Sequence, residues 1–511
     1  MFSRTRRPAA LIILDGWPVP DGSSTNLLAR AHTPFYSELC EQFPRSELAA
    51  AGPYVGLMDD EEGGPEAGHR MIGAGRVLMA DSVRIRNAVA SDEFSRNAVL
   101  RGALEKAARS GKCVHFIGLL SDAGTESHQD SLFALLRMAR SVGVERPFVH
   151  CILDGLDVRP RTADVYVEAL QVKMAEIGVG RVASVCGRFF AMDSRQNWER
   201  TARAFTMLVH GEGERARDPI SAIRASYLRG ISDEFITPVV IENELAEPVA
   251  TVRDGDLVIF FNHGAEAMRQ LARSLTVSDA VGLKGKVDTV CLTEYDADLS
   301  LPVAFGPGHA RNTLGEMFDL CGVRNYRITE SARAEHVTEF FNGRGHARGE
   351  LEKRLVLQAE EQQPLETGPE SKSFKIADRA ITSLEGDPEA ALIVNLPAAD
   401  IAADGADNGR VIEAMQYVDT CLGGILERLR HLGGAAIITS SHPATRTAGV
   451  SENKAHNFRN SRVPVHYFDP SNSASHQLRP DGSLEDVAPT LLRMIGIDKP
   501  SDMTGRDLLS N

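Results

Sequence analysis

Short aliphatic runs recur along this chain, and each of them leads into glycine or polar residues. The clearest runs lie at residues 10–17, 114–124, 147–157, 181–189, 256–264, 391–400 and 435–442. Runs of this kind, rich in β-branched and aliphatic residues, are typical of buried strands. Amphipathic stretches lie between several of them, and residues 130–141 and 409–432 have the clearest helical spacing of apolar side chains. The alternation of strands and helices predicts an α/β fold with mainly parallel sheets.

Polar side chains at the ends of the predicted strands mark the expected place of a binding site. Asp15, Asp400 and His442 each follow an apolar run. In parallel α/β sheets, ligands bind beside the carboxyl ends of the strands. Two stretches that contain prolines, residues 302–312 and 359–373, are instead predicted to be loops or linkers.

The composition narrows the class of protein and of partner. A chain of 511 residues is long enough for two or more domains of roughly 100–200 residues each. The net charge is −14, which disfavours a nucleic-acid or anionic-membrane partner. The cysteines are scattered without a CxxC pair, so a reducing compartment is expected. No apolar run approaches the ~18 residues of a membrane span, and a cytoplasmic location is therefore predicted.

A series of motifs in chain order is more specific than the composition. The motifs are LIILDGW (11–17), GHRMIGAGRV (68–77), HFIGLLSDAGTESHQDSLFALL (115–136), DGLDVRPRTA (154–163), GRFFAMDSRQNWERTARAF (187–205), NTLGEMF (312–318) and HVTEFFNG (336–343). Together they resemble the 2,3-bisphosphoglycerate-independent phosphoglycerate mutases of the alkaline phosphatase superfamily. The resemblance runs from about Leu11 to Leu508.

The resemblance implies an architecture and a reaction. A phosphatase-type domain would comprise residues 1–77 and 312–511, and a transferase-type domain, residues 82–307, would be inserted into it. Members of the family hold two manganese ions and bind substrate between the domains. A serine takes the phosphoryl group and returns it to the other hydroxyl of glycerate, which interconverts 3-phosphoglycerate and 2-phosphoglycerate.

The residues at the reacting positions depart from the family pattern. Pro65 stands where the family has its nucleophilic serine, and proline offers neither a hydroxyl nor a backbone N–H. Glu126 stands where the family has its general-base histidine. No catalytic residue is therefore expected at these two positions.

The metal ligands that the resemblance implies are only partly kept. Asp15, Asp400 and His442 match family ligands, whereas Ser441 replaces an aspartate. Asp404 takes the place of a histidine, and His456 aligns with the last ligand only if a gap is allowed. The expectation is that the chain binds no metal, or binds a divalent ion such as manganese or magnesium weakly through these residues. The histidines at 115, 150 and 336 are isolated and are interpreted as structural or solvent-exposed residues, not as ligands.

The substrate-binding residues are also incomplete. Asp157, Arg188 and His128 are kept, and Arg333 replaces a family lysine. Family arginines are missing at the four positions Leu156, Ser194, Gly264 and Ala267. Because arginine binds phosphate and carboxylate through a bidentate fork, these losses weaken anion binding.

These observations leave two possible functions, which belong to different classes. The first is a catalytically inactive homologue of the mutase that acts by binding a protein partner, as a scaffold or regulator, or by binding a small ligand in the old cleft. The alternative is an enzyme: a divergent metal-dependent phosphoryl-transfer enzyme or hydrolase, or a phosphoglycerate mutase. The sequence favours the inactive homologue, because the departures concentrate on the reacting groups.

Overall fold

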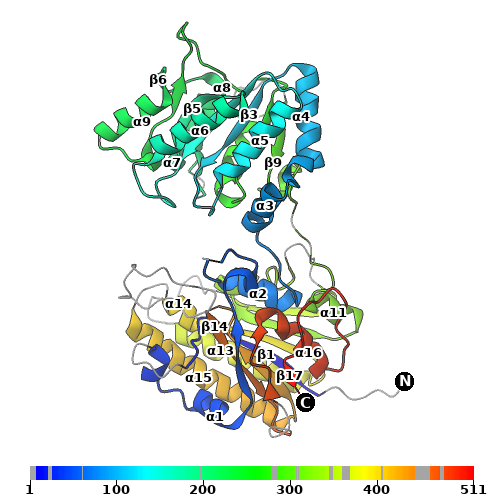
Figure 1. The fold of residues 1–511 in the computed structure, drawn as a ribbon. Coiled ribbons are helices and arrows are strands. Elements are labelled where there is room, and N and C mark those ends of the chain that lie inside the picture. Colours follow the sequence, from blue (N-terminus) through cyan, green and yellow to red (C-terminus); the bar gives the residue numbers. More distant parts are fainter. Residues whose placement is uncertain are drawn as a thin grey trace. The chain divides into compact units, whose positions relative to one another are not determined.

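The structure is a computed structural model. It describes residues 7–20, 26–59, 61–194, 197–277, 286–306, 308, 310–343, 349–358, 369–403, 407–442, 461–471 and 477–510. The chain divides into two compact units: residues 1–80 and 308–511 form the first, and residues 81–307 form the second. Figure 1 shows each unit as a sheet flanked by helices.

The first unit is built on an eight-stranded mixed sheet with the strand order β11-β10-β12-β1-β13-β14-β2-β16. The strands are β1 (Ala9–Leu14), β2 (Arg45–Ala49), β10 (Asn325–Glu330), β11 (Glu352–Leu357), β12 (Ala391–Leu396), β13 (Ala435–Thr439), β14 (Arg462–Phe468) and β16 (Gly482–Ser483). The five strands β11, β10, β12, β1 and β13 run parallel to one another. Strand β14 pairs antiparallel with both β13 and β2. The short strands β15 (Gln477–Leu478) and β17 (Leu509–Ser510) pair with each other.

Helices cover both faces of this sheet. They are α1 (Pro34–Gln42), α2 (Pro65–Ala74), α11 (Leu314–Leu320), α12 (Ala334–Val337), α13 (Pro369–Gly386), α14 (Ala398–Ala403), α15 (Asn408–His431) and α16 (Val487–Met494). Alternate residues of β1 enter two different cores. Ile12 packs with α13 and α15, whereas Leu11 packs with α2 and α16. A strand such as β1, which is apolar on both faces, is expected at the centre of such a sheet.

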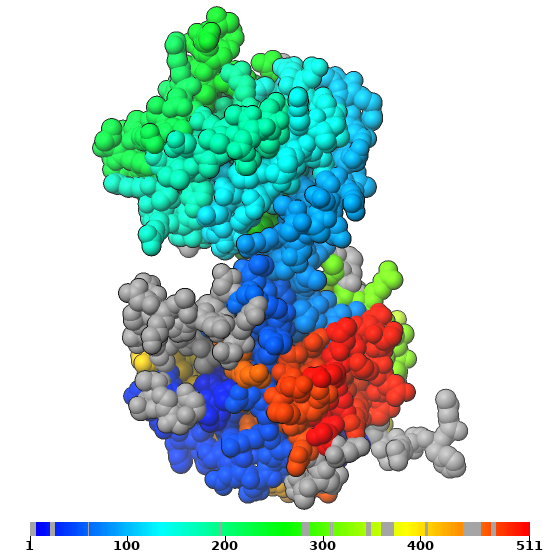
Figure 2. Space-filling model, in the orientation of Figure 1, coloured from blue at the N-terminus to red at the C-terminus, as the bar shows by residue number. Residues whose placement is uncertain are grey.

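The segment that contains α16 forms a continuous part of the surface of this unit, red in Figure 2.

The second unit has a seven-stranded sheet with the order β6-β7-β5-β4-β3-β8-β9. Its strands are β3 (Val114–Leu120), β4 (Pro147–Leu153), β5 (Arg181–Gly187), β6 (Glu214–Ala216), β7 (Val239–Ile241), β8 (Leu257–Phe260) and β9 (Asp288–Cys291). All pairs are parallel except β5 with β7. Its helices are α3 (Asp81–Ala90), α4 (Ala98–Ser110), α5 (Gln129–Ser141), α6 (Ala163–Ile177), α7 (Arg188–Ala191), α8 (Trp198–His210), α9 (Pro219–Leu228) and α10 (Arg269–Thr276).

The predicted α/β class is confirmed, and each of the seven apolar runs contains a strand. The loop predicted at 359–373 is wrong at its end, because α13 begins at Pro369. Proline is favoured in the first turn of a helix, where its missing N–H costs nothing. Residues 359–368 lie outside the described residues. Among the helices that the structure describes, none is long and apolar enough to cross a bilayer.

We expect acid to destabilise the first unit through His466 in β14. Burial lowers the pKa of His466 to about 3, so between pH 7 and pH 4 the unfolded chain binds a proton that the folded chain does not. The free energy of unfolding therefore falls by roughly 3 kcal/mol as the pH drops from 7 to 4. Urea unfolding at both pH values should show a smaller pH dependence for His466→Gln than for the unchanged chain. An equal dependence in the two proteins would contradict the assignment.

Candidate active site

Asp15 is the centre of the polar cluster in the first unit. It follows β1 directly, at the carboxyl edge of the sheet, and it is fully buried. Its carboxylate accepts a hydrogen bond from Asn395 Nδ2 at 2.6 Å. The Nε2 atom of His69 lies 3.1 Å from both carboxylate oxygens, and His336 Nδ1 lies 3.1 Å from Oδ2. The Ser441 hydroxyl donates to Oδ1.

Close packing of α2 places His69 beside Asp15. A Cβ atom added at Gly68 would lie 1.8 Å from the carbonyl oxygen of Ser441, and one at Gly73 would lie 1.8 Å from that of Phe341. Only glycine fits at these two positions, since any side chain would push the helix away. The glycines of the GHRMIGAGRV motif therefore bring the first unit's candidate ligands together.

The charges in the cluster favour an ionised carboxylate and a neutral imidazole. Burial alone would raise the pKa of Asp15, but its contacts with His69 and His336 hold it well below its usual range. Burial lowers the pKa of His69, against the attraction of Asp15. Neutral imidazole and carboxylate are the forms that ligate metal ions.

Asp15, His69 and His336 could hold a divalent metal ion. One ligand atom from each of them lies within 4.8 Å of the others, and all three residues are buried. One carboxylate and two imidazoles suit first-row divalent ions, including manganese. The donor set therefore fits the manganese that the family resemblance implies.

A second chain of contacts leads from Asp15 towards the surface. Ser441 Oγ lies 2.9 Å from His442 Nδ1, and His442 Nε2 lies 3.0 Å from Asp400 Oδ1. Arg333 donates to the other oxygen of Asp400 at 3.0 Å, and its side chain is 22% exposed. Burial alone would lower the pKa of His442, but the hydrogen bond to Asp400 and the nearby carboxylates raise it. This arrangement of hydroxyl, imidazole and carboxylate resembles the geometry that activates a serine nucleophile.

Of the five predicted metal ligands, the structure brings three into this site. Asp15, Asp400 and His442 are connected through Ser441, whereas Asp404 and His456 lie outside the described residues. Sequence reasoning missed His69 and interpreted His336 as structural. The available signal for His69 was its place in the GHRMIGAGRV motif. His336 lies in a short helix after β10. Its proximity to Asp15 could be predicted only from the parallel pairing of β10 with β12, which the sequence does not show.

Pro65 is the first residue of α2, and its side chain offers no reacting group. The described hydroxyl in contact with Asp15 is that of Ser441. Ser441 follows β13 and is far from Pro65 in sequence, so an inspection of the residues around Pro65 could not identify it.

The predicted substrate residues of the second unit gather at the carboxyl ends of β4 and β5. Arg188 Nη1 donates to Asp154 and to Asp157, each at 2.7 Å. Glu126 Oε2 is buried without a hydrogen-bond partner among the described residues, and a Cβ atom at Gly264 would lie 1.7 Å from it. His128 is used differently, because its Nδ1 accepts from Asp130 N and caps α5.

Burial and the surrounding charges raise the pKa of Glu126. Burial is the main cause, and the carboxylates of Asp157, Glu266 and Asp154 act in the same direction, although Arg188 opposes them. A carboxyl group with a raised pKa keeps its proton to a higher pH than an ordinary carboxyl group, which suits a general acid or base.

Comparisons with known proteins cover the whole chain. A family model described as the BPG-independent PGAM N-terminus matches residues 85–297. A 2,3-bisphosphoglycerate-independent phosphoglycerate mutase of Desulforudis audaxviator is 40% identical over 511 residues, which is 98% of this chain and 99% of that protein. A protein of the same name from Vibrio cholerae is 34% identical over 510 residues, 99% of each. A solved phosphoglycerate mutase of Leishmania mexicana, crystallised at low cobalt concentration, has the same fold, with a TM-score of 0.70, 24% identity, and coverage of 100% of this chain and 99% of that one.

These findings correct two predictions from the sequence. The interpretation as a catalytically inactive homologue is wrong, and so is the prediction that the chain is not an enzyme. Relatives that are 34–40% identical over the full length are mutases, and the Asp15 cluster holds a suitable set of metal-ligating atoms. The error arose because only aligned ligand positions were counted, which left out His69 and His336. The predicted protein partner is not tested by these findings and stays a prediction.

Proposed function

The chain belongs to the 2,3-bisphosphoglycerate-independent phosphoglycerate mutase family, and we propose that it interconverts 3-phosphoglycerate and 2-phosphoglycerate by metal-dependent phosphoryl transfer. The observation that carries this proposal is the buried cluster of Asp15, His69 and His336 in contact with the Ser441 hydroxyl. The names of the relatives supply the substrate. We place the reaction in the cytoplasm, as the sequence predicts.

We propose that Asp15, His69 and His336 hold manganese, with Asp400 and His442 beside them. When bound, the ion supplies Lewis-acid stabilisation of the charge that develops on the transferring phosphoryl group. Asn395 orients Asp15 through the hydrogen bond to Oδ2. Such outer contacts fix the direction of a ligand and commonly matter for affinity.

We propose Ser441 as the phosphoryl acceptor in place of the serine that Pro65 has replaced. Its hydroxyl hydrogen can rotate from Asp15 to His442 Nδ1, which lies 2.9 Å from Oγ. Attack on phosphorus then forms the Oγ–P bond while the P–O bond to glycerate breaks. His442 takes the hydroxyl proton, and the glycerate oxygen that leaves takes a proton from Glu126. The reverse steps, at the other glycerate hydroxyl, complete the isomerisation.

The remaining roles follow from charge and exposure. Arg333 is the partly exposed end of the chain of contacts, so we assign it to binding the substrate phosphate. Arg188 and Asp157 are our proposed substrate residues in the second unit. Glu126 is our proposed proton donor and acceptor there, because its pKa is raised.

The direct test is an assay of the purified full chain with manganese and 3-phosphoglycerate. We expect 2-phosphoglycerate to form, with no matching release of inorganic phosphate. Release of phosphate in place of 2-phosphoglycerate would indicate the alternative, a metal-dependent hydrolase. Folded protein with bound manganese and neither product would contradict the proposal.

We expect Glu126→Gln to lower turnover by about 10²- to 10⁴-fold, the usual contribution of a general acid or base. Turnover of the unchanged enzyme should fall as the pH drops through the raised pKa of Glu126, since the base must be ionised. The Gln variant should lack this acid limb. Glu266→Gln is the matched control: it should keep the acid limb, moved to slightly lower pH, because Glu266 only raises the pKa of Glu126. The same acid limb in the Glu126→Gln variant would exclude Glu126.

A further inference from the structure

A second group of metal-ligating side chains lies in the second unit, apart from the site described above. Cys113 directly precedes β3, His115 is the second residue of β3, and Asp256 directly precedes β8. Strands β3 and β8 are parallel neighbours with Val114 opposite Leu257. The three side chains therefore meet at the amino edge of the sheet, whereas Arg188 and Asp157 lie at the carboxyl edge.

One ligand atom from each of Cys113, His115 and Asp256 lies within 4.8 Å of the others, and all three residues are buried. We propose that they form a binding site for a divalent ion of the zinc type, which joins the beginnings of β3 and β8. The proposal does not depend on the proposed mutase function.

The spacing of two of the donors fits tetrahedral coordination. His115 Nε2 lies 3.4 Å from Asp256 Oδ2. With zinc–nitrogen and zinc–oxygen bonds of about 2.0–2.1 Å, a tetrahedral angle separates two donor atoms by about 3.3–3.4 Å. The distance between these two donor atoms therefore matches the distance across a bound zinc ion.

The surroundings of His115 fix the orientation of its ring. His115 Nδ1 lies 2.9 Å from His150 Nε2, and His150 Nδ1 lies 2.8 Å from Ser184 Oγ. His150 Nε2 can accept from His115 Nδ1–H while His150 Nδ1 donates to Ser184 Oγ. Metal-ligating histidines commonly donate their other N–H to such a partner.

In this tautomer, the His115 Nε2 lone pair faces Asp256 Oδ2. Two acceptor atoms repel each other unless a cation or a proton lies between them. Asp256 itself is held by the backbone, since Oδ1 accepts from Cys113 N at 3.1 Å and Oδ2 accepts from Arg253 N at 2.9 Å. The Cys113 thiol has no hydrogen bond to another described residue, so its sulfur is available as the third ligand.

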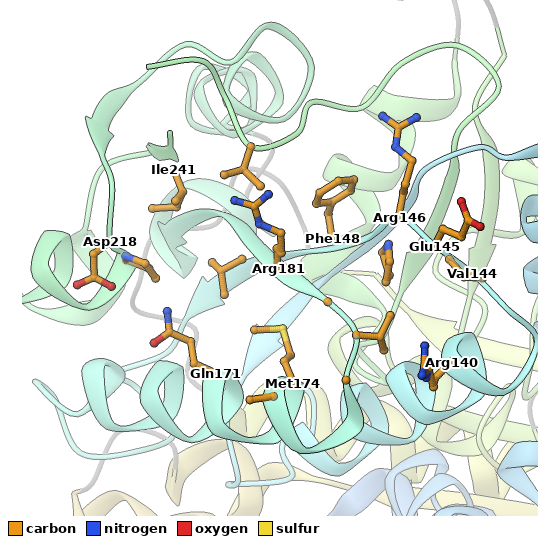
Figure 3. Close-up of a pocket in the computed structure, with 18 of the residues that line it drawn as sticks. Arg140, Val144, Glu145, Arg146, Phe148, Gln171, Met174, Arg181, Asp218 and Ile241 are labelled. Atoms are coloured by element: carbon orange, nitrogen blue, oxygen red, sulfur yellow. The ribbon is translucent and has the colours of Figure 1, made fainter. Parts of the chain in front are cut away.

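The donor set distinguishes this site from the Asp15 cluster. Its thiolate makes the difference, because a soft sulfur ligand favours zinc over manganese and magnesium, and Asp15, His69 and His336 offer no sulfur. The site also lies close to solvent. Phe148 stacks on His115 with ring centroids 5.8 Å apart, and it lines a groove of about 1170 Å³ together with Arg146 and Arg181 (Figure 3). Phe148 therefore separates the His115 ring from this groove.

The test uses the full chain in the Asp15→Asn background, which removes the central ligand of the first cluster. The protein is stripped with a chelator and titrated with Co²⁺ and, separately, with Zn²⁺. We expect one equivalent of Co²⁺ to produce a thiolate-to-cobalt charge-transfer band, and Zn²⁺ to raise the unfolding temperature. Cys113→Ser should abolish the band, and His150→Phe should weaken binding about 10- to 100-fold.

Cys291→Ser is the matched control, because Cys291 is a buried cysteine that ends β9 in the same sheet. This variant should keep the band. If Cys113→Ser does not fold, His115→Gln is measured in its place and should also lack the band. Folded, stripped protein that gives neither the band nor a thermal shift would overturn the proposal and place a proton between His115 and Asp256. A band that persists in folded Cys113→Ser would also overturn it.

Discussion

Replacing Asp15 by asparagine is expected to lower the turnover of 3-phosphoglycerate by about three orders of magnitude and to abolish tight binding of manganese. Asp15 is the carboxylate shared by His69, His336, Asn395 and Ser441. The substitution keeps the shape of the side chain but removes its charge. Loss of Lewis-acid stabilisation worth about 4 kcal/mol corresponds to roughly a 10³-fold change in rate.

The matched control is Asp419→Asn, which neutralises another buried carboxylate of the same unit. Asp419 accepts from the backbone N–H groups of Phe35 and Tyr36 at the beginning of α1, so its contacts are structural. This variant should bind manganese and turn over substrate like the unchanged enzyme. Circular dichroism establishes that both variants fold. Turnover of Asp15→Asn within tenfold of the unchanged enzyme, with manganese bound, would contradict the assigned role of Asp15.

The strands that sequence reasoning predicted are those whose residues form mainly apolar runs. Strand β1 and its parallel neighbours β12 and β13 are buried on both faces and therefore read as continuous aliphatic runs. Strand β10 was missed because it contains Arg327, which is fully buried. Arg327 is accommodated by a hydrogen bond to Asn325 and by contact with the ring of Phe341. Such compensation depends on tertiary structure and cannot be read from local pattern.

Sequence reasoning predicted those residues of the site that lie at the ends of strands. Asp15 and His442 were found in this way, because carboxyl ends of parallel strands meet at one edge. His69 and His336 come from helices, and their proximity to Asp15 depends on how closely α2 packs. The role of Ser441 depends on the same packing, since Gly68 lies against its carbonyl group. A list of aligned positions therefore underestimated what the folded chain brings together.

Removing the Ser441 hydroxyl is expected to have the largest effect of all. Loss of a nucleophile lowers turnover on the order of 10⁶-fold, so Ser441→Ala should fall to background. The independent readout is the covalent intermediate. Enzyme quenched in acid after mixing with 3-phosphoglycerate should carry a phosphate on the peptide that contains Ser441, as detected by mass spectrometry. Ser440→Ala is the neighbouring control, because its hydroxyl donates only to the His442 carbonyl oxygen at 2.9 Å, and it should keep turnover and the phosphopeptide.

Pro65 provides a second, stricter form of the same test. Pro65 is the first residue of α2, where serine can replace it without loss of a helical hydrogen bond. In the Ser441→Ala background, Pro65→Ser should restore part of the turnover and move the phosphate to residue 65, because the family resemblance places the acceptor hydroxyl there. Phosphate on residue 65 would show that the Asp15 site acts on any hydroxyl presented to it. Full turnover in Ser441→Ala alone would instead exclude Ser441, since a site that had lost its acceptor could not keep its rate.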